Sequence, residues 1–243
     1  MSIRHDILYA LGLGALLAFG QPCAAQDREE ISAYQDEAGA RMILFRGEQA
    51  ESYTFLANGN PFWTSAEYRT GNIVVQGRSY YGVQVNLDAV QQRALVRVQG
   101  SPVAVSLAPA RVSSIELENA RFVGIGPGGA LPEGFYQVFG TGAEKVFKAE
   151  HKYLASSADN VNGETIGYYD KNYRYDLTRY FALRTEYWFL DAEGNFSRVR
   201  GKGALLGKFG PRKKAIRKAM NGTGIDRLPF DAYCEAVLKI AAQ

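Results

Sequence analysis

The most regular alternation of apolar and polar residues lies between residues 71 and 117. Residues 80–88 have a period of two, which is typical of a half-buried strand. One predicted face holds Tyr81, Val83, Val85 and Leu87, and the other holds Tyr80, Gln84, Asn86 and Asp88. Residues 94–99 and 103–107 flank the turn at 100–102 and predict two more strands. We expect this meander to be the frame of the fold.

Further strands are predicted downstream of the meander. Residues 121–125 form one apolar run. A hairpin is predicted to join residues 135–139 to 145–149, and another joins 186–190 to 196–199, each through a glycine-containing turn. The predicted strands therefore continue almost to residue 200.

The apolar period changes from 2 to 3.6 after Gly203, which predicts helices. Pro211 suits the first turn of a helix over residues 212–220, and Pro229 opens a last helix. The apolar stripe of the last helix is Phe230, Tyr233, Cys234, Val237, Leu238 and Ala241. The predicted fold class is mainly β, an antiparallel meander forming an open half-barrel or a sandwich, with a short C-terminal helical segment.

The N-terminal residues have the pattern of a secretory signal peptide. Arg4 precedes an apolar run over residues 7–19, and small residues end at Ala25. Such a run is shorter than the roughly 20 residues that span a bilayer. We predict cleavage after Ala25 and export to the periplasm or the cell exterior. Lipoprotein anchoring at Cys23 stays open as an alternative, although Pro22 stands where that signal favours a small residue.

Four segments follow from this pattern. We predict a cleaved signal peptide at 1–25, an N-terminal arm with the first strands at 26–60, an antiparallel β domain at 61–200, and a helical segment at 201–243 packed on the sheet. Two short apolar runs, at residues 42–45 and 52–56, lie in the arm. Removal of the signal peptide leaves Cys234 without a partner for a disulfide within the chain, so the fold depends on its core.

Three stretches carry a resemblance to a known group of proteins. They are residues 71–75 with 80–82, residues 134–148, and residues 186–190 followed by the basic segment 212–218 and the last helix. These stretches are spread along the mature chain from residue 71 to the last helix. In these stretches the chain resembles a group of uncharacterised exported proteins of Bacteroidota-type bacteria. The resemblance implies export and a β-sheet with a helical tail, and it implies no activity.

Catalytic signatures are few. The mature chain has one histidine, His151, in a predicted strand, and Cys234 lies in an apolar helix stripe where a thiol behaves as a small hydrophobe. The glycine pattern at residues 124–129 fits G-x-G-x-x-G, but no helix follows it, so we interpret it as a turn. The sequence leans against an enzyme, and we expect no cofactor and no metal.

Aromatic and basic residues crowd the stretch from 168 to 189. Exposed tyrosines beside arginines suit contacts with glycans or peptides, because they offer rigid area with a polar tip. The alternative is that they are the alternating inward and outward residues of two strands. The candidate binding residues are Tyr168, Tyr169, Tyr173, Arg174, Tyr175, Arg179, Tyr187 and Trp188.

A block of positive charge follows, with no acidic residue between Glu193 and Asp226, although the net charge of the chain is only +3. The block suits an anionic partner, and its alternative is a solvated helix face. We predict no nucleic-acid partner, because an exported protein seldom meets one. The candidate contacts are Arg198, Arg200, Lys208, Arg212, Lys213, Lys214, Arg217 and Lys218; Lys202 belongs to the block but not to this set.

These features predict a non-catalytic exported envelope protein that acts as a binding or scaffolding module. The expected partner is an envelope protein, an anionic lipid headgroup or a glycan, with no transmembrane span after signal cleavage. One alternative is a carrier of an apolar or lipid ligand, with a cavity lined by Tyr81, Val83, Val85, Val103 and Val105. Another is a secreted hydrolase built on carboxylates such as Asp170, Asp176 and Glu186.

Overall fold

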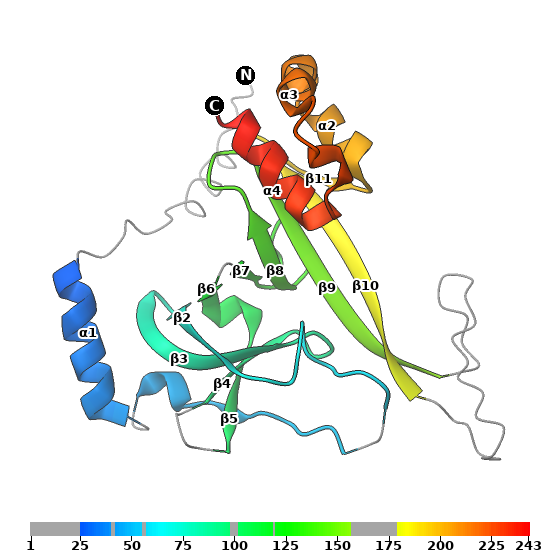
Figure 1. The fold of residues 1–243 in the computed structure, drawn as a ribbon. Helices are drawn as coiled ribbons and strands as arrows, with labels where there is room; N and C mark the ends of the chain where they lie inside the picture. Colours follow the sequence, from blue (N-terminus) through cyan, green and yellow to red (C-terminus); the bar gives the residue numbers. More distant parts are fainter. Residues whose placement is uncertain (1–24, 40–41, 55–56, 98–101, 119, 157–178) are drawn as a thin grey trace, which may run out of the picture.

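Eleven strands form one open sheet in the order β1-β5-β4-β3-β2-β6-β7-β8-β9-β10-β11, and all neighbours are antiparallel (Figure 1). The computed structural model describes residues 25–39, 42–54, 57–97, 102–118, 120–156 and 179–243. The strands are β1 (Glu48–Gln49), β2 (Arg69–Val75), β3 (Arg78–Asp88), β4 (Arg93–Arg97), β5 (Ala104–Leu107), β6 (Val112–Leu117), β7 (Ala120–Ile125), β8 (Gly134–Phe139), β9 (Lys145–Ser156), β10 (Arg179–Leu190) and β11 (Phe196–Val199). The helices are α1 (Ala25–Ala38), α2 (Lys202–Lys208), α3 (Lys213–Met220) and α4 (Phe230–Ala241).

The predicted fold class is confirmed: the protein is mainly β, and its antiparallel meander ends in a short helical segment. The strands of the described residues form a single sheet that does not close, and these residues contain no second sheet that would make a sandwich. The predicted frame at 71–117 corresponds to β2 through β6. After β5, the 3₁₀ turn Pro109–Arg111 carries the chain back so that β6 pairs with β2.

The predicted alternation in β3 is wrong at its start. The register with β2 shifts between Gly71 and Ile73, so β3 holds one extra residue there, and Gly82 has a φ of 64°. Such a bulge reverses the alternation. Tyr80, and not Tyr81, therefore packs with Val83 in the core. Asn86 and Asp88, predicted on the polar face, are also buried, with exposures of 3% and 2%.

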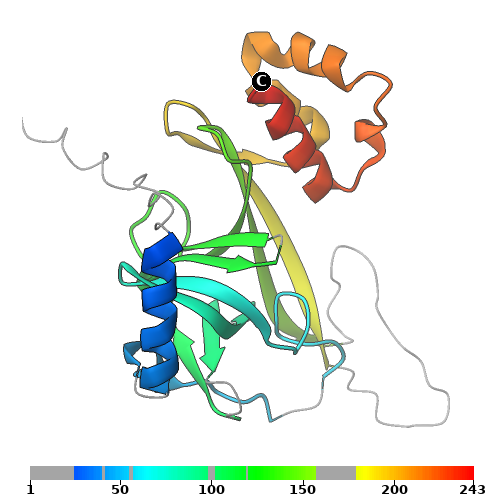
Figure 2. The same ribbon diagram turned by 60° about the vertical axis from the view of Figure 1, so that its left-hand side comes forward.

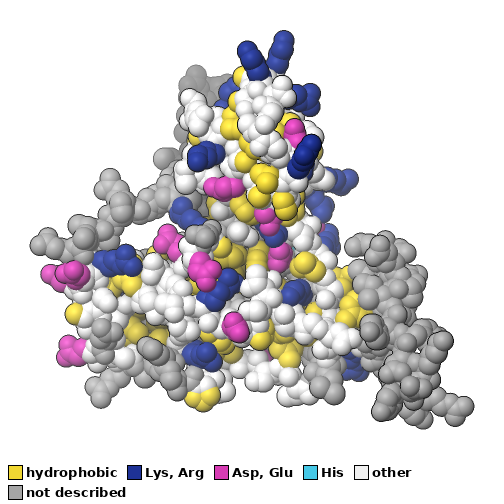
Figure 3. Space-filling view, viewed as in Figure 1, with side chains coloured by type: hydrophobic (Ala, Val, Ile, Leu, Met, Phe, Trp, Pro, Cys, Tyr) yellow, Lys and Arg dark blue, Asp and Glu magenta, His cyan; other side chains and the backbone are white. Residues whose placement is uncertain are grey.

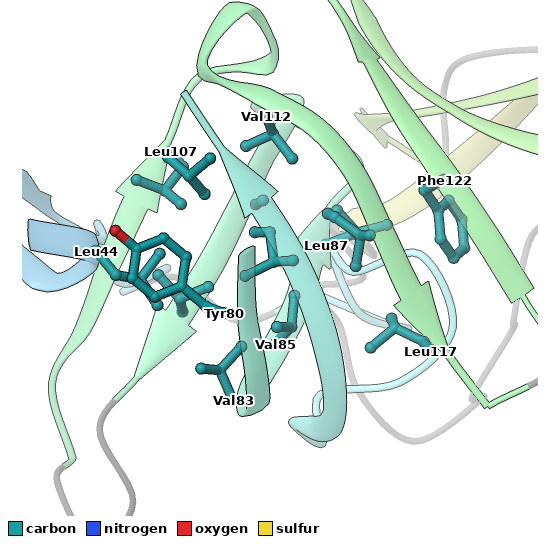
Figure 4. Packing of buried hydrophobic residues seen from close by; sticks show 14 of the residues in the cluster. Leu44, Tyr80, Val83, Val85, Leu87, Leu107, Val112, Leu117 and Phe122 are labelled. Atoms are coloured by element: carbon teal, nitrogen blue, oxygen red, sulfur yellow. The ribbon is translucent and has the colours of Figure 1, made fainter. Parts of the chain in front are cut away.

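The main core lies inside the curved part of the sheet. Side chains from β2 to β8 and from the segment before β1 point toward one another there (Figure 4). Fully buried members include Leu44, Val85, Leu107 and Ile115. α1 lies along β3 (Figure 2). There the side-chain amide of Gln35 donates through Nε2 to Ser79 O and accepts through Oε1 from Tyr81 N. Burying this apolar area supplies the dominant favourable contribution to folding.

The sheet curls far enough for the β3–β4 turn to dock against β9. The backbone N–H of Lys152 donates to Ala89 O at 2.9 Å, and the side-chain Nε2 of Gln92 donates to Glu150 O at 2.8 Å. Gln92 also accepts from Phe135 N at 3.1 Å. These bonds satisfy backbone groups where the two ends of the curl meet, so the sheet approaches a half-barrel while staying open.

The three C-terminal helices cover one face of β8 to β11 and form a second core (Figure 1). As predicted, the stripe of α4 faces inward: Tyr233, Cys234, Val237 and Leu238 are buried against Phe139, Val146, Phe189 and Val199. We call α2, α3 and α4 the helical cap. A third cluster, which includes Phe147 and Leu190, packs on the opposite face of the same strands.

The N-terminal arm differs from the prediction. Residues 43–45 form a 3₁₀ turn and not a strand, and residues 52–54 are not in a strand; 55–56 lie outside the described residues. The first strand, β1, has only two residues. Within the described parts of the chain, no helix has both the length and the apolar character needed to cross a membrane.

Candidate functional site

A pocket of about 530 Å³ lies where β11 ends and the helical cap begins. It is formed because β11 stops at Val199 while β10 continues past it, which leaves a notch beside the loop into α2. We call this site the basic pocket. It is lined by Thr185, Glu186, Tyr187, Arg198, Val199, Arg200, Gly201, Lys202 and Phe230.

The charge of the basic pocket is positive. Of the described residues that line it, three are cationic and Glu186 alone is acidic. Glu186 Oε1 accepts from Arg198 Nη2 and from Arg184 Nη2, at 2.7 Å each, so its charge is already neutralised. Arg200 is exposed and takes part in no ion pair among the described residues. Arg200 is thus the cation most available to an incoming anion.

Lys202 is placed at the other side of the pocket by two contacts. Its ammonium donates to Asp226 O at 2.6 Å and lies 5.2 Å from the ring centroid of Tyr233. Both contacts leave the positive charge without a carboxylate partner in the described structure. Lys202 therefore adds uncompensated positive charge to the pocket.

An aromatic wall faces these cations. The rings of Tyr187 and Phe230 meet edge to face, with centroids 4.6 Å apart and an interplanar angle of 83°. Phe230 also stacks on Tyr233 at 6.3 Å. Such pairs are rigid and offer apolar contact area beside the charged groups.

A half-buried polar cluster holds the aromatic wall in place. Lys148 donates to Glu150 Oε1 at 2.6 Å and to Asp231 Oδ2 at 2.7 Å, and the Tyr187 hydroxyl donates to Asp231 Oδ1 at 2.6 Å. We call Lys148, Glu150, Tyr187 and Asp231 the clamp. Lys148 and Tyr187 are directly opposite in the β9–β10 register, and Asp231 lies in the first turn of α4. The clamp therefore joins the sheet to the helical cap.

Electrostatics explains the protonation states in the clamp. Burial alone would lower the pKa of Lys148, but its hydrogen bonds with Asp231 and Glu150 outweigh burial and raise that pKa. Burial, together with the hydrogen bond to Asp231, raises the pKa of the Tyr187 phenol well above its usual range. Lys148 is therefore charged and Tyr187 is neutral at neutral pH.

The two candidate acid–base groups His151 and Cys234 lie in different parts of the described structure. His151 and Lys148 lie three residues apart in β9, so their side chains point to opposite faces of the sheet. Burial lowers the pKa of His151. Cys234 is fully buried in the second core, and burial raises its pKa to about 12. Among the described residues, no group of three His, Cys, Asp or Glu side chains is arranged to hold a metal ion.

The predicted aromatic set is only partly visible. Tyr168, Tyr169, Tyr173, Arg174 and Tyr175 lie outside the described residues. Arg179 is exposed at the start of β10, and Tyr187 lines the basic pocket. Trp188 packs with the third cluster, opposite Phe147, so the structure does not bring it to the pocket.

The predicted basic block is divided between two places. Arg198 and Arg200 line the pocket, whereas Lys208, Lys213, Lys214, Arg217 and Lys218 belong to α2 and α3. Lys and Arg side chains gather over this cap in the upper part of Figure 3. Arg212 is tied to Glu144 by an ion pair and donates to Ala241 O at 3.1 Å. The block is therefore not one continuous contact surface.

Sequence reasoning missed several residues of the site. The predicted contacts do not include Lys202, and the apolar pattern places Phe230 in the core stripe alone, but both line the pocket. Nothing in the sequence indicates that Lys148 meets Asp231, because 83 residues separate them. The alternating charges of Lys148 and Glu150 in a predicted strand were a usable signal, since buried charges need partners.

The residues named for the two alternative functions are also dispersed. Val83 and Val85 lie in the packed main core, and Val103 is 48% exposed. Val103 lines a second pocket, of about 330 Å³, and Glu51 is the one charged side chain among the described residues that line it. Asp170 and Asp176 lie outside the described residues, and Glu186 is held by two arginines.

In comparisons with known proteins, no family model, curated protein or solved structure matches this chain. The resemblance to exported proteins of Bacteroidota-type bacteria therefore stays a prediction.

Proposed function

We propose that the protein is an exported, non-catalytic binding module that holds an anionic group of an envelope partner in the basic pocket. One observation supports this proposal above the others. Arg198 and Arg200 from the predicted basic block and Tyr187 from the predicted aromatic set line the same pocket. One residue of the predicted aromatic set and two of the predicted basic block thus share this pocket.

The chemistry of binding follows from the lining of the pocket. Arg200 and Lys202 attract the anion, and the wall of Tyr187 and Phe230 contacts the apolar part of the same ligand. The clamp fixes this wall before the ligand arrives, which lowers the ordering cost of binding. Since Arg200 is exposed, the affinity falls as salt concentration rises.

The test is a titration of the purified protein with three anionic probes: an acidic peptide, phosphatidylglycerol vesicles and an anionic polysaccharide. Binding to at least one probe is expected, and R200E/K202E weakens it by at least about tenfold. The matched control is K213E/K214E, which makes the same charge change on α3 and leaves binding within about threefold. Absence of binding to every probe, or equal losses in both variants, contradicts the proposal.

Export is tested separately. The intact gene is expressed in a Gram-negative host, and the N-terminus of the protein from the periplasmic fraction is read by mass spectrometry. The prediction is a chain that begins at Gln26. A cytoplasmic protein that retains Met1 contradicts export, and a lipid-modified Cys23 supports the alternative anchor.

A further inference from the structure

Within the described part of the chain, the outer edge of β10 has no pairing partner over five residues that lead into the basic pocket. β11 covers Tyr187 to Leu190, and Asn58 forms a parallel bridge with Tyr180 at the other end. Between these two contacts, residues 182–186 have no strand beside them among the described residues. At about 3.3 Å per residue, the gap is roughly 17 Å long.

Hydrogen bonds at both ends show which backbone groups face outward. Phe181 N donates to Asn58 O, and Asp191 N donates to Asn195 O, at 3.1 Å each. In a strand, alternate residues direct their N–H and C=O to the same side. The outward groups in the gap are therefore those of Leu183 and Thr185, and neither makes a backbone hydrogen bond on that side within the described structure.

The exposed side chains of this edge invite a partner strand but disfavour a second copy of this chain. Leu183 is 45% exposed, and no proline interrupts the edge. In a two-fold pairing of β10 with itself about Arg184, the two Arg184 side chains would lie directly opposite each other. Like charges in that position are destabilising. The nearby cations Arg198, Arg200 and Lys202 instead favour an anionic segment.

The geometry favours the end of a chain over an internal stretch. A strand laid on this edge is collinear with β11, which already occupies the edge from Tyr187 onward. The added strand must therefore stop or turn away at the basic pocket, where Arg200 and Lys202 lie. A C-terminal carboxylate satisfies both requirements. The strand would then run parallel to β10, as the Asn58 segment already does.

We propose that the C-terminal segment of a partner polypeptide adds as a parallel strand to residues 182–186 of β10 and places its terminal carboxylate in the basic pocket. Its backbone pairs with the outward groups of Leu183 and Thr185, and its last side chain contacts Phe230 and Tyr187. Main-chain pairing supplies affinity, while the pocket selects the terminus. This inference rests on the proposed function, since it names the ligand of the same pocket.

The test uses two matched random libraries of short peptides, one with free C-terminal carboxylates and one with C-terminal amides. Peptides selected from the free-acid library are expected to bind at least about tenfold more tightly than their amide twins. N-methylation of alternate backbone amides of the selected peptide removes strand pairing without changing this protein. Methylation of the amides that would pair with β10 is expected to weaken the affinity of the peptide by at least about tenfold. Methylation of the other amides is expected to leave the affinity unchanged.

A substitution in the edge gives a second measurement. T185P removes an outward N–H that no ladder bond uses, and proline is tolerated at such edge positions. T185V keeps that N–H and is the matched control. With unchanged circular dichroism for both variants, peptide affinity falls for T185P and is retained for T185V.

The outcomes separate the two proposals. Equal affinity of free-acid and amide peptides overturns the inference, and so does indifference to N-methylation and to T185P. If only phosphatidylglycerol vesicles or the polysaccharide bind, with loss in R200E/K202E, the proposed function stands and the strand-addition inference fails. If no anionic probe and no peptide binds, both proposals are wrong.

Discussion

The Tyr187 hydroxyl donates a 2.6 Å hydrogen bond to Asp231, which connects β10 to the first turn of α4. The same tyrosine ring forms a wall of the basic pocket. One side chain thus takes part in both the attachment of the helical cap and the shape of the site. Stability and binding are therefore coupled through the clamp. The hydroxyl of Tyr187 stabilises the attachment of the cap, and its ring shapes the pocket.

Y187F separates these two roles. It removes the hydroxyl that bonds to the Asp231 carboxylate and keeps the ring against Phe230. A hydrogen bond to a charged group contributes about 1.5–3 kcal/mol, so we expect the free energy of unfolding to fall by about 1–2 kcal/mol in this half-buried site. Urea unfolding measures the loss. Y153F on exposed Tyr153 is the control and should change stability by less than about 0.5 kcal/mol.

K148M removes the cation of the clamp. Glu150 and Asp231 are then left without their ammonium partner, and Glu150 is only 7% exposed. Breaking a buried ion pair from one side costs about 3–5 kcal/mol. The same change at exposed Lys214 of α3 should be nearly neutral. Equal unfolding midpoints for K148M and K214M would show that the clamp contributes little.

His151 predicts a pH dependence with a definite sign. Burial lowers its pKa below the usual value of about 6.5; Glu186 opposes this shift and Arg184 adds to it. As the pH falls through about 6.5, the unfolded chain therefore binds a proton before the folded chain does. The contribution of His151 to stability is fully present above that pH and is lost below it. Between pH 7.5 and 5.5, H151Q should lose less stability than the unsubstituted protein, and parallel profiles would refute this assignment.

Gly124 is required by close packing. A Cβ at this position would meet the carbonyl oxygens of Pro109 and Val112 well inside van der Waals contact. G124A should therefore destabilise the protein by about 2 kcal/mol or more, measured by thermal and urea unfolding. Gly203 in α2 has open space around it, so G203A should stabilise by about 0.5–1 kcal/mol. Similar effects of both substitutions would contradict the packing of the 3₁₀ turn Pro109–Arg111 against β7.

The sequence predicts the secondary-structure elements better than it predicts the tertiary contacts between them. The period of two located the meander, and the stripe of α4 identified Tyr233 and Val237 as core residues. A glycine inside a predicted strand marks a bulge, so Gly82 was the available warning that Tyr80 would face inward.

The site depends on contacts that no local pattern contains. The hydrogen bond between Tyr187 and Asp231 joins residues 44 positions apart in the sequence, and the one between Lys148 and Asp231 joins residues 83 positions apart. The pocket itself exists because β11 ends before β10 does, and strand ends are not fixed by alternation. Charge density therefore indicated the basic block but did not separate Arg200 from the residues on α3.

The most direct measurement of the central claim is the location of a bound anion. The backbone amide resonances of the ¹⁵N-labelled protein are followed by nuclear magnetic resonance during titration with N-acetylglutamate, and its uncharged amide analogue is the control. The account predicts saturable shifts at Thr185, Arg200 and Lys202, which are absent with the analogue. Shifts confined to Lys213–Met220, or no saturable shift at all, would contradict it.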